Sequence, residues 1–283
     1  MTNMAKTVSL INMKGGVGKS TLTVNLAWHF AAYRNWLKRV LVVDLDPQFN
    51  ASQYLMGVSG YRQVIDEERP TVWSIFEANT KIPGAKADPI EAKDTVQNVT
   101  TIQGGGRLDL IPSRLELALS LKNPGNKERM LAPALRELEG EYDLILIDCA
   151  PTESILTTAA YLSSDYILVP VKPEYLSTIG LPLLVNSMQD FSRDYKEHNI
   201  ELAGIVFNAT TDYSPEESKS KREVKDLAKK YNWYVFKTEL AYSRSYPKGA
   251  REGQPIFRTT YARTDQASLF RAFAQEFAGR IGL

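Results

Sequence analysis

The sequence predicts an α/β fold: a doubly wound, mostly parallel sheet flanked by helices, in a single domain. Short apolar runs of strand length alternate with segments of helix length along most of the chain, and such alternation produces parallel sheets with helices on both faces. A chain of 283 residues with 43% hydrophobic residues can bury one large core. No Pro/Gly/Ser-rich linker divides it, so we expect one domain spanning 1–283.

The individual elements follow from local composition. Runs rich in Val, Ile and Leu predict strands at 7–12, 39–45, 107–111, 142–148, 165–171, 202–208 and 233–237. Apolar residues at helical spacing predict helices at 19–35, 127–139, 154–162, 178–196, 216–231 and 264–280. The segment 58–104 fits this alternation poorly, and it is predicted to be either an inserted cap or surface decoration. A short helix at 71–78 and a turn at 104–106 are predicted within it.

A glycine-rich loop joins the first predicted strand to the first predicted helix. Residues 14–21 read Lys-Gly-Gly-Val-Gly-Lys-Ser-Thr. Glycines let successive backbone N–H groups wrap a phosphate, and the following helix N-terminus adds a favourable dipole. In such a loop Lys19 reaches the β- and γ-phosphates, and the Ser20 hydroxyl ligates Mg²⁺. The loop predicts a P-loop NTPase whose phosphate-binding residues are Lys14, Gly15, Gly16, Val17, Gly18, Lys19, Ser20 and Thr21.

Carboxylates end two further apolar runs. Asp44 and Asp46 close the second predicted strand, where alternation places both on the same side. Asp148 closes the run 142–148. Ligands of parallel sheets bind at the carboxyl ends of strands, and an acidic residue there can hold the Mg²⁺ shell directly or through water. The residues that these motifs predict to bind the metal are Ser20 and Asp148.

The loop departs from the common pattern G-x-x-x-x-G-K-[ST], because its first glycine would fall at Met13 and a second lysine stands at Lys14. This variant and the two carboxylate motifs resemble the ParA/MinD family of deviant-Walker ATPases, and within it the ParA/Soj partition group. The resemblance covers roughly residues 6–280. It rests on the segments Lys14–Thr21, Val42–Gln48, Leu110–Ser113, Leu144–Pro151 and Val169–Glu174.

The resemblance implies a role for each motif residue. Lys14 is expected to reach across a nucleotide-sandwich dimer to the partner's phosphates and neutralise charge there. Asp46 is expected to orient or activate the attacking water, which makes Lys14, Lys19 and Asp46 the predicted catalytic set. Asp148 matches the Walker B aspartate, and Asp44 is expected either to join Ser20 and Asp148 in the Mg²⁺ shell or to act as a switch residue. Asn208 is expected to read the adenine edge, since an amide carries both a donor and an acceptor; the alternative for it is an ordinary turn residue.

The resemblance also implies a function. We expect an ATP hydrolase that requires Mg²⁺, turns over slowly, forms a homodimer on ATP binding and is stimulated by a ParB-like or other adaptor protein. In its ATP state it would bind non-specific double-stranded DNA. Such a cycle would segregate plasmid or chromosome DNA, or position cargo, on the nucleoid in the cytoplasm of a bacterium or archaeon.

The charge distribution points to one candidate DNA surface. The net charge of +1 gives no global nucleic-acid signal, but basic residues gather between 237 and 271. A second basic cluster, on the predicted helix 216–231, is interleaved with acids and predicts a solvated face. An ordinary basic surface is the alternative for 237–271 as well. The candidate DNA contacts are Arg244, Lys248, Arg251, Arg258 and Arg263.

Two other functional classes are weighed against this one. The first is a membrane-cycling ATPase of the MinD kind, because the chain ends in an apolar stripe at helical spacing. We expect this stripe to pack on the sheet, and we do not expect a membrane partner. The second is a nucleotide-binding scaffold with little turnover, against which the lysines and aspartates of the motifs argue. The stripe consists of Leu269, Phe270, Phe273, Phe277 and Ile281.

The remaining composition excludes several kinds of site. The longest apolar runs have strand length, which argues against a transmembrane helix, and the N-terminus shows no apolar signal-peptide core. The single cysteine, Cys149, excludes an internal disulfide and fits a reducing compartment. With only two histidines beside it, a structural zinc site or an iron–sulfur cluster is not expected.

Overall fold

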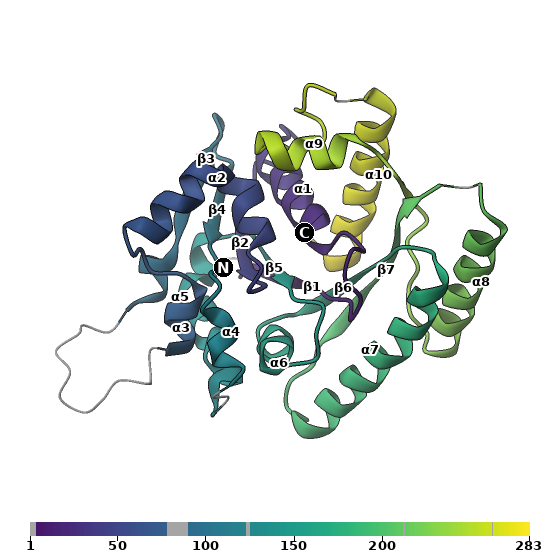
Figure 1. Ribbon diagram of the computed structural model, residues 1–283, viewed down its shortest axis with the longest axis horizontal. Coiled ribbons are helices and arrows are strands. Elements are labelled where there is room, and N and C mark those ends of the chain that lie inside the picture. Colours follow the sequence, from purple (N-terminus) through teal and green to yellow (C-terminus); the bar gives the residue numbers. More distant parts are fainter. Residues whose placement is uncertain (1–3, 78–89, 123–124, 212, 262) are drawn as a thin grey trace.

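Within the described residues, eight strands form one sheet in the order β3-β4-β2-β5-β1-β6-β7-β8 in this computed structural model (Figure 1). The structure describes residues 4–77, 90–122, 125–211, 213–261 and 263–283. Every pairing is parallel except that of β3 with β4, so the predicted fold class is confirmed. The strands are β1 (Lys6–Leu10), β2 (Arg39–Leu45), β3 (Gln97–Thr101), β4 (Arg107–Ile111), β5 (Leu144–Cys149), β6 (Tyr166–Val171), β7 (Glu201–Thr210) and β8 (Leu240–Ala241).

Helices cover both faces of the sheet (Figure 1). One hydrophobic layer lies between the sheet and α1, α2 and α10, and the other lies between the sheet and α3 to α8. The helices are α1 (Lys19–Ala32), α2 (Asn50–Asp66), α3 (Val72–Glu77), α4 (Leu117–Ser120), α5 (Leu131–Leu138), α6 (Ile155–Leu162), α7 (Tyr175–Asp194), α8 (Pro215–Lys230), α9 (Ser245–Glu252) and α10 (Thr264–Ile281). Short 3₁₀ turns are η1 (Ala92–Thr95), η2 (Lys127–Arg129) and η3 (Glu139–Glu141).

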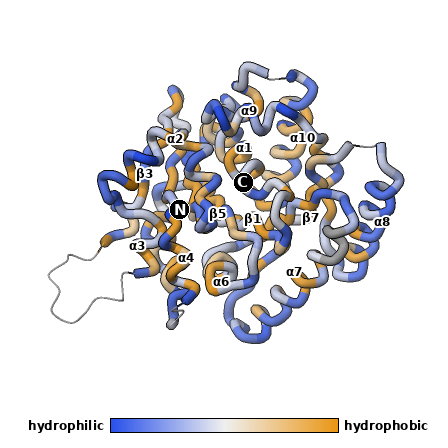
Figure 2. Tube along the Cα trace, in the orientation of Figure 1, coloured by the Kyte–Doolittle hydropathy of each residue, from blue (hydrophilic) through white to orange (hydrophobic). Residues whose placement is uncertain are grey.

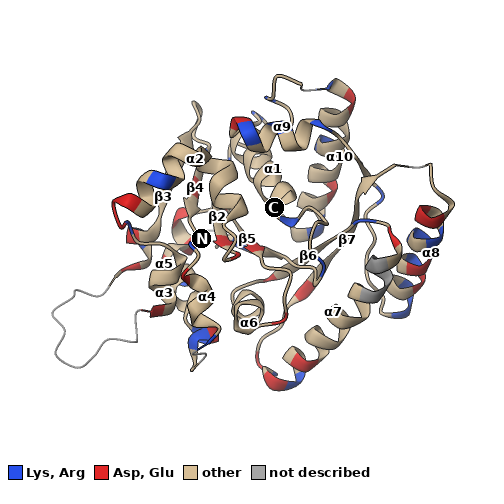
Figure 3. Ribbon diagram, in the orientation of Figure 1, with Lys and Arg blue, Asp and Glu red and all other residues tan. Residues whose placement is uncertain are grey.

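Strand β2 shows how a continuous apolar run serves both layers. Val40 and Val42 belong to the layer of α1, whereas Leu41, Val43 and Leu45 belong to the opposite layer. Successive side chains of a strand point to opposite faces, so a strand between two helical layers is apolar throughout. The trace of α8 is mostly hydrophilic (Figure 2), and charges of both signs alternate along it (Figure 3). This agrees with the solvated face predicted there.

The C-terminal stripe packs on the sheet, as expected. Phe270, Phe273, Phe277 and Ile281 of α10 are buried in the layer that α1 shares. Truncating a buried Phe to Ala typically costs about 3–5 kcal/mol, so this stripe is a large contribution to the core. Among the described residues, no helix combines the length and the apolar composition needed to cross a bilayer.

The prediction of a strand at 233–237 was wrong. Only Val235 forms a bridge to β7 there, and the last strand of the sheet is β8 instead. The carboxylate of Glu276 accepts hydrogen bonds from the amides of Lys237 and Thr238, at 2.8 and 3.2 Å. A side chain from α10 therefore satisfies backbone groups that a strand would have used.

The segment 58–104 contains the second half of α2, then α3, η1 and β3. Helix α3 confirms the short helix predicted at 71–78, and the turn at 104–106 joins β3 to β4. In that turn the Ile102 amide donates to the carbonyl of Gly106 at 2.7 Å. Residues 78–89 lie outside the described residues. The status of the segment as an insert stays a prediction.

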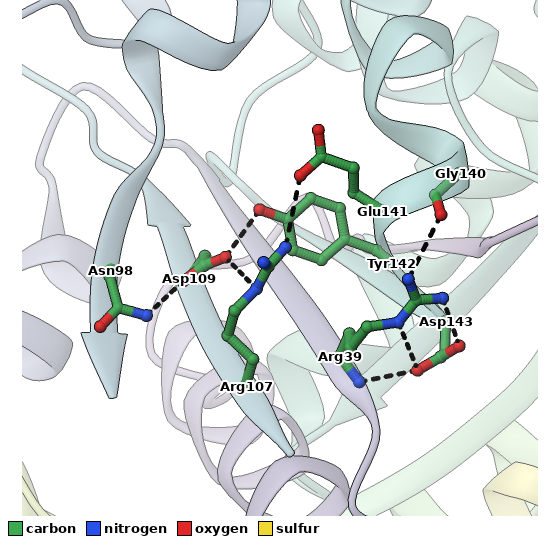
Figure 4. Close-up of polar contacts among 8 residues, drawn as sticks. All are labelled: Arg39, Asn98, Arg107, Asp109, Gly140, Glu141, Tyr142 and Asp143. Carbon is green, nitrogen blue, oxygen red and sulfur yellow. Dashed lines mark hydrogen bonds and ion pairs between the residues drawn. The ribbon is translucent and has the colours of Figure 1, made fainter. Parts of the chain in front are cut away.

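A buried carboxylate fastens the antiparallel edge of the sheet. Asp109 of β4, whose side chain is 5% exposed, accepts hydrogen bonds from Asn98 Nδ2 and Tyr142 Oη, both at 2.7 Å (Figure 4). Arg107 Nε pairs with the same carboxylate at 2.8 Å. Because a buried charge is tolerated only when it is paired, this network ties β3 and the entry to β5 onto β4.

Candidate functional site

Glycines and Asn208 shape the loop between β1 and α1. Gly16 and Gly18 have φ angles of 75° and 91°, in the left-handed region that other residues avoid. Asn208 Nδ2 donates to the carbonyl of Val17 at 2.8 Å, and a Cβ on Gly18 would lie 2.2 Å from that nitrogen. The structure therefore brings Asn208 onto the loop, and its contact with adenine stays a prediction.

Lys19 is the first residue of α1 and is only 6% exposed. Its Nζ donates to the backbone carbonyls of Asn12 and Lys14, at 3.0 and 3.1 Å. Burial lowers the pKa of Lys19, and the negative charges of Asp148 and Asp46 oppose that effect. A buried ammonium held by neutral carbonyls can gain a stronger, charge-assisted bond from a phosphate, so the arrangement fits an anionic ligand.

Asp148 lies in β5, in register with Asp44 of β2. Thr23 Oγ1 donates to Asp148 Oδ1 at 3.4 Å, whereas the buried Oδ2 has no hydrogen-bond partner among the described residues. Burial, followed by the charge of Asp44, raises the pKa of Asp148 well above its usual value, while the nearby Ser20 hydroxyl opposes this. A buried oxygen that lacks a donor, beside a serine hydroxyl, fits Mg²⁺.

Asp44 is as buried as Asp148, but groups of helix α2 donate hydrogen bonds to its carboxylate. Its Oδ2 accepts hydrogen bonds from Ser52 N and Oγ at 2.7 and 2.6 Å, and its Oδ1 accepts from Asp46 N at 3.2 Å. Ser52 Oγ in turn accepts from Ser113 N at 2.9 Å, and burial raises the pKa of Asp44 to about 7. Asp44 thus positions α2 against β2 and β4. Its place in a metal shell stays a prediction, because Ser52 competes for the same oxygen.

Asp46 faces a cavity of about 610 Å³ above the glycine loop. Its side chain is nearly buried, and Oδ1 accepts a hydrogen bond from Gln48 N at 2.9 Å. The loop forms one wall of this cavity, and α2 and α9 form the other. Sequence reasoning did not single out the lining residues Gln53, Tyr54, Gly57, Val58 and Ala250. Both wall helices lay outside the predicted helices, so no signal marked them.

Arg251 also lines this cavity, from α9. The sequence predicted it as a DNA contact, but its position gives it a second candidate ligand, the nucleotide. Gly249 lets α9 approach α2 closely, since a Cβ on it would lie 2.6 Å from the hydroxyl of Tyr54. This close packing holds Arg251 in the wall of the cavity.

The other predicted DNA contacts differ in whether their side chains form ion pairs with carboxylates of the protein. Lys248 and Arg263 each pair with a nearby carboxylate, at 3.2 and 3.0 Å. Arg244 and Arg258 are exposed and have no ion-pair partner in the described part of the chain, although Arg258 stacks over Trp28 at 5.1 Å. Arg244 and Arg258 are therefore the most available to a phosphate backbone, and DNA contact stays a prediction for all of these residues.

Lys14 forms an ion pair with Glu174 of the same chain. Glu174 precedes α7, and its other oxygen pairs with Lys172 at 3.0 Å. The hydrogen bond from Lys14 lowers the pKa of Glu174. Sequence reasoning missed this pair because its members are 160 positions apart. The role of Lys14 across a dimer interface stays a prediction.

Comparison with known proteins finds relatives along nearly the whole chain. Residues 5–202 match a family model described as an AAA domain. The chain is 31% identical over 283 residues to an uncharacterized protein of Mycobacterium tuberculosis, which covers 99% of this chain and 80% of that protein. It is 29% identical over 256 residues to the sporulation initiation inhibitor protein Soj of Bacillus subtilis, covering 89% of this chain and 90% of Soj.

The fold also matches a solved structure at low sequence identity. Apo McdA of Cyanthece superposes with a TM-score of 0.78 at 19% identity, over 97% of this chain and 100% of that one. At such identity the match shows a shared fold. It agrees with the observed strand order and with helices on both faces.

Proposed function

Because this chain belongs to the ParA/MinD-like family of P-loop ATPases, with Soj among its relatives, we propose that it is a positioning ATPase of the partition type. It binds ATP with Mg²⁺, forms a homodimer, binds non-specific double-stranded DNA in that state, and hydrolyses ATP slowly until a partner protein stimulates it. One observation carries the proposal: Lys19 and Asp148 Oδ2, which has no hydrogen-bond partner in the described part of the chain, lie together at a glycine loop that lines a cavity.

Different residues at the loop would bind the phosphates, the Mg²⁺ ion and the attacking water. The backbone N–H groups of 15–19 and the ammonium of Lys19 hold the phosphates, with the N-terminus of α1 behind them. Ser20 and Asp148 would hold Mg²⁺, which neutralises phosphate charge when bound. Asp46 faces the same cavity and is the group that accepts a hydrogen bond from the attacking water.

Lys14 connects hydrolysis to dimerisation. In the monomer it is held by Glu174, so it must leave this carboxylate before it reaches the phosphates of a second subunit. There its charge stabilises the negative charge that develops during phosphoryl transfer. Dimer formation thus includes the breaking of one partly buried ion pair in each subunit.

Helix α9 connects the nucleotide cavity to the basic surface. The amide of Ile256, just after α9, donates to Asn25 Oδ1 of α1 at 2.7 Å, and Tyr54 of α2 donates to the carbonyl of Gln254 at 3.3 Å. Movement of α1 or α2 on nucleotide binding therefore displaces α9. Arg244 and Arg258 flank this helix, and their alignment in a dimer would give backbone-dominated, salt-sensitive DNA binding.

The partner is an adaptor protein of the ParB kind or another cargo adaptor, and the place of action is the nucleoid. No observation favours membrane cycling over this, because the apolar stripe of α10 is buried in the core. A scaffold with little turnover would not need a carboxylate such as Asp46 at the cavity.

Three single substitutions test the proposal through ATP binding, dimer mass and phosphate release. Lys19→Ala should abolish ATP binding, because it removes the buried cation of the loop. Lys14→Ala should keep ATP binding to the monomer and lose the dimer or turnover. Asp46→Ala should accumulate an ATP-bound dimer. Normal hydrolysis by Lys14→Ala would refute the role of this lysine and the dimer mechanism with it.

A further inference from the structure

A second cavity, of about 680 Å³, lies at the opposite edge of the sheet from the glycine loop. It is bordered by α5, by the end of α6 and by the turn that follows α7. These elements lead into the amino ends of β5, β6 and β7, whereas the nucleotide residues follow carboxyl ends. Because β6 has six residues, the two sites are about 20 Å apart. We call this cavity the basal pocket; its lining includes Arg129, Arg136, Leu162, Tyr195, Lys196 and His198.

The basal pocket has a surplus of unpaired positive charge. Within the described ranges, no carboxylate forms an ion pair with Arg129, Arg136 or Lys196. Arg193 differs, since it pairs with Asp190 and Asp194 at 2.9 and 3.4 Å. Two acidic residues, Asp194 and Glu197, also border the pocket, and Figure 3 shows both signs at the C-terminal end of α7. The net charge of the lining is nevertheless positive, which attracts an acidic ligand.

Aromatic contacts hold one wall of the basal pocket in place. The guanidinium of Arg129 lies 5.1 Å above the ring of Tyr195, which stacks on Phe191 with ring centroids 5.0 Å apart. His198 packs edge-on against Phe191, and its Nε2 lies 3.3 Å from the carbonyl of Ser164. A wall that is already ordered loses little side-chain entropy on binding.

The floor of the pocket is apolar. Leu162 of α6 and Ala132 and Pro133 of α5 line it between the charged groups. Arg129 and Arg136 are seven positions apart along η2 and α5, which corresponds to about 10 Å at the helical rise. In a polyproline II segment, carboxylates three residues apart lie on the same side of the peptide and have nearly the same spacing, about 9 Å at about 3.1 Å per residue.

We propose that the basal pocket binds an acidic, amphipathic segment of a partner protein. Carboxylates of the segment pair with Arg129, Arg136 and Lys196, and an apolar side chain between them enters the floor beside Leu162. The site lies away from the nucleotide cavity and from Arg244 and Arg258, so such a partner and ATP bind at the same time. The pocket is an attachment point for cargo, independent of the proposed catalytic cycle.

The test uses the full-length protein and a fluorescein-labelled peptide of repeated Glu-Leu-Ser units. Fluorescence anisotropy is measured at roughly 0.1 M salt, where distant surface charges are screened. The pocket variant is Arg129→Glu combined with Arg136→Glu. Its matched control is Lys219→Glu combined with Arg222→Glu, which makes the same charge change on exposed positions of α8.

The pocket variant should bind the peptide at least about tenfold more weakly than the control variant does. A Gln-Leu-Ser peptide should not bind, and a Glu-Ser-Ser peptide should bind more weakly than the original. Arg136→Gln, a mild change at an exposed position, should give a smaller loss in the same direction, and thermal unfolding checks that each variant is folded.

Three results would overturn the inference. Equal weakening in both double variants would mean non-specific attraction to positive charge. Absence of peptide binding to the natural sequence would remove the proposed ligand class. Full displacement of the peptide by inorganic pyrophosphate would assign the pocket to a small phosphorylated ligand.

Discussion

Replacing Glu174 with glutamine should strengthen ATP-dependent dimerisation, because it removes the charge that holds Lys14 within its own subunit. Glutamine keeps the size of the side chain and one acceptor oxygen, but it carries no charge. The side chains of Lys14 and Glu174 are 17% and 39% exposed, so the ion pair is neither buried nor fully solvated.

The magnitude follows from this exposure. Exposed ion pairs contribute about 0.2–1 kcal/mol, and the low exposure of Lys14 places this pair at the upper end of that range. The Lys14–Glu174 pair competes with the contact that Lys14 would make in the dimer. Losing a pair worth about 1 kcal/mol in each subunit should lower the dimer dissociation constant about fivefold for each lysine released. The effect should shrink at high salt, since the pair is partly screened.

The assay is sedimentation velocity with ATP, in the Asp46→Ala background, where ATP should remain intact. Glu116→Gln is the matched control, because Arg114 and Glu116 form a pair with nearly the same exposures, 18% and 41%. An unchanged or weaker dimer in Glu174→Gln, relative to Glu116→Gln, would show that the Lys14–Glu174 pair does not restrain the lysine.

Three further predictions concern the loop, a buried histidine and the cavity wall. Gly18→Ala should weaken ATP binding at least about tenfold in a calorimetric titration, because its φ is 91° and a Cβ has no room; Gly279→Ala, whose Cβ would meet nothing within 4 Å, should not. Burial lowers the pKa of His29 from 6.5 to about 4, so the unfolded chain binds the proton first as the pH falls. The natural protein should therefore lose about 3 kcal/mol of unfolding free energy between pH 6.5 and 4 relative to His29→Phe, as measured by urea unfolding of both. Arg251→Ala should raise the Kd for ATP several-fold, because Arg251 lines the cavity above the glycine loop. Arg62 does not line that cavity, so Arg62→Ala should leave the Kd unchanged.

The parts of the fold that the sequence predicts well are those set by local composition. Strands such as β2 are apolar because both of their faces are buried. The loop between β1 and α1 needs its glycines for their backbone geometry. Each signal lies within a few consecutive residues. The motif residues Lys19, Asp46 and Asp148 come together at one edge of the sheet for the reason predicted, since parallel strands end at the same edge.

The elements that were missed owe their structure to distant contacts. Helix α9 contains Pro247 and Gly249, which are poor helix formers, and tertiary packing on α2 holds it. Strand β3 is a polar edge strand, anchored through Asn98 to the buried Asp109. The ion pair of Lys14 and the position of Arg251 at the cavity likewise depend on residues distant in the sequence, so no local sequence pattern predicts them.

Binding to non-specific double-stranded DNA, measured with ATP, with ADP and without nucleotide at one fixed moderate salt concentration, decides whether the nucleotide controls DNA binding by this protein. We expect binding with ATP alone, weakened in a variant that combines Arg244→Ala with Arg258→Ala and lost in Lys19→Ala. Equal binding in all three nucleotide states, or none in any, would contradict it.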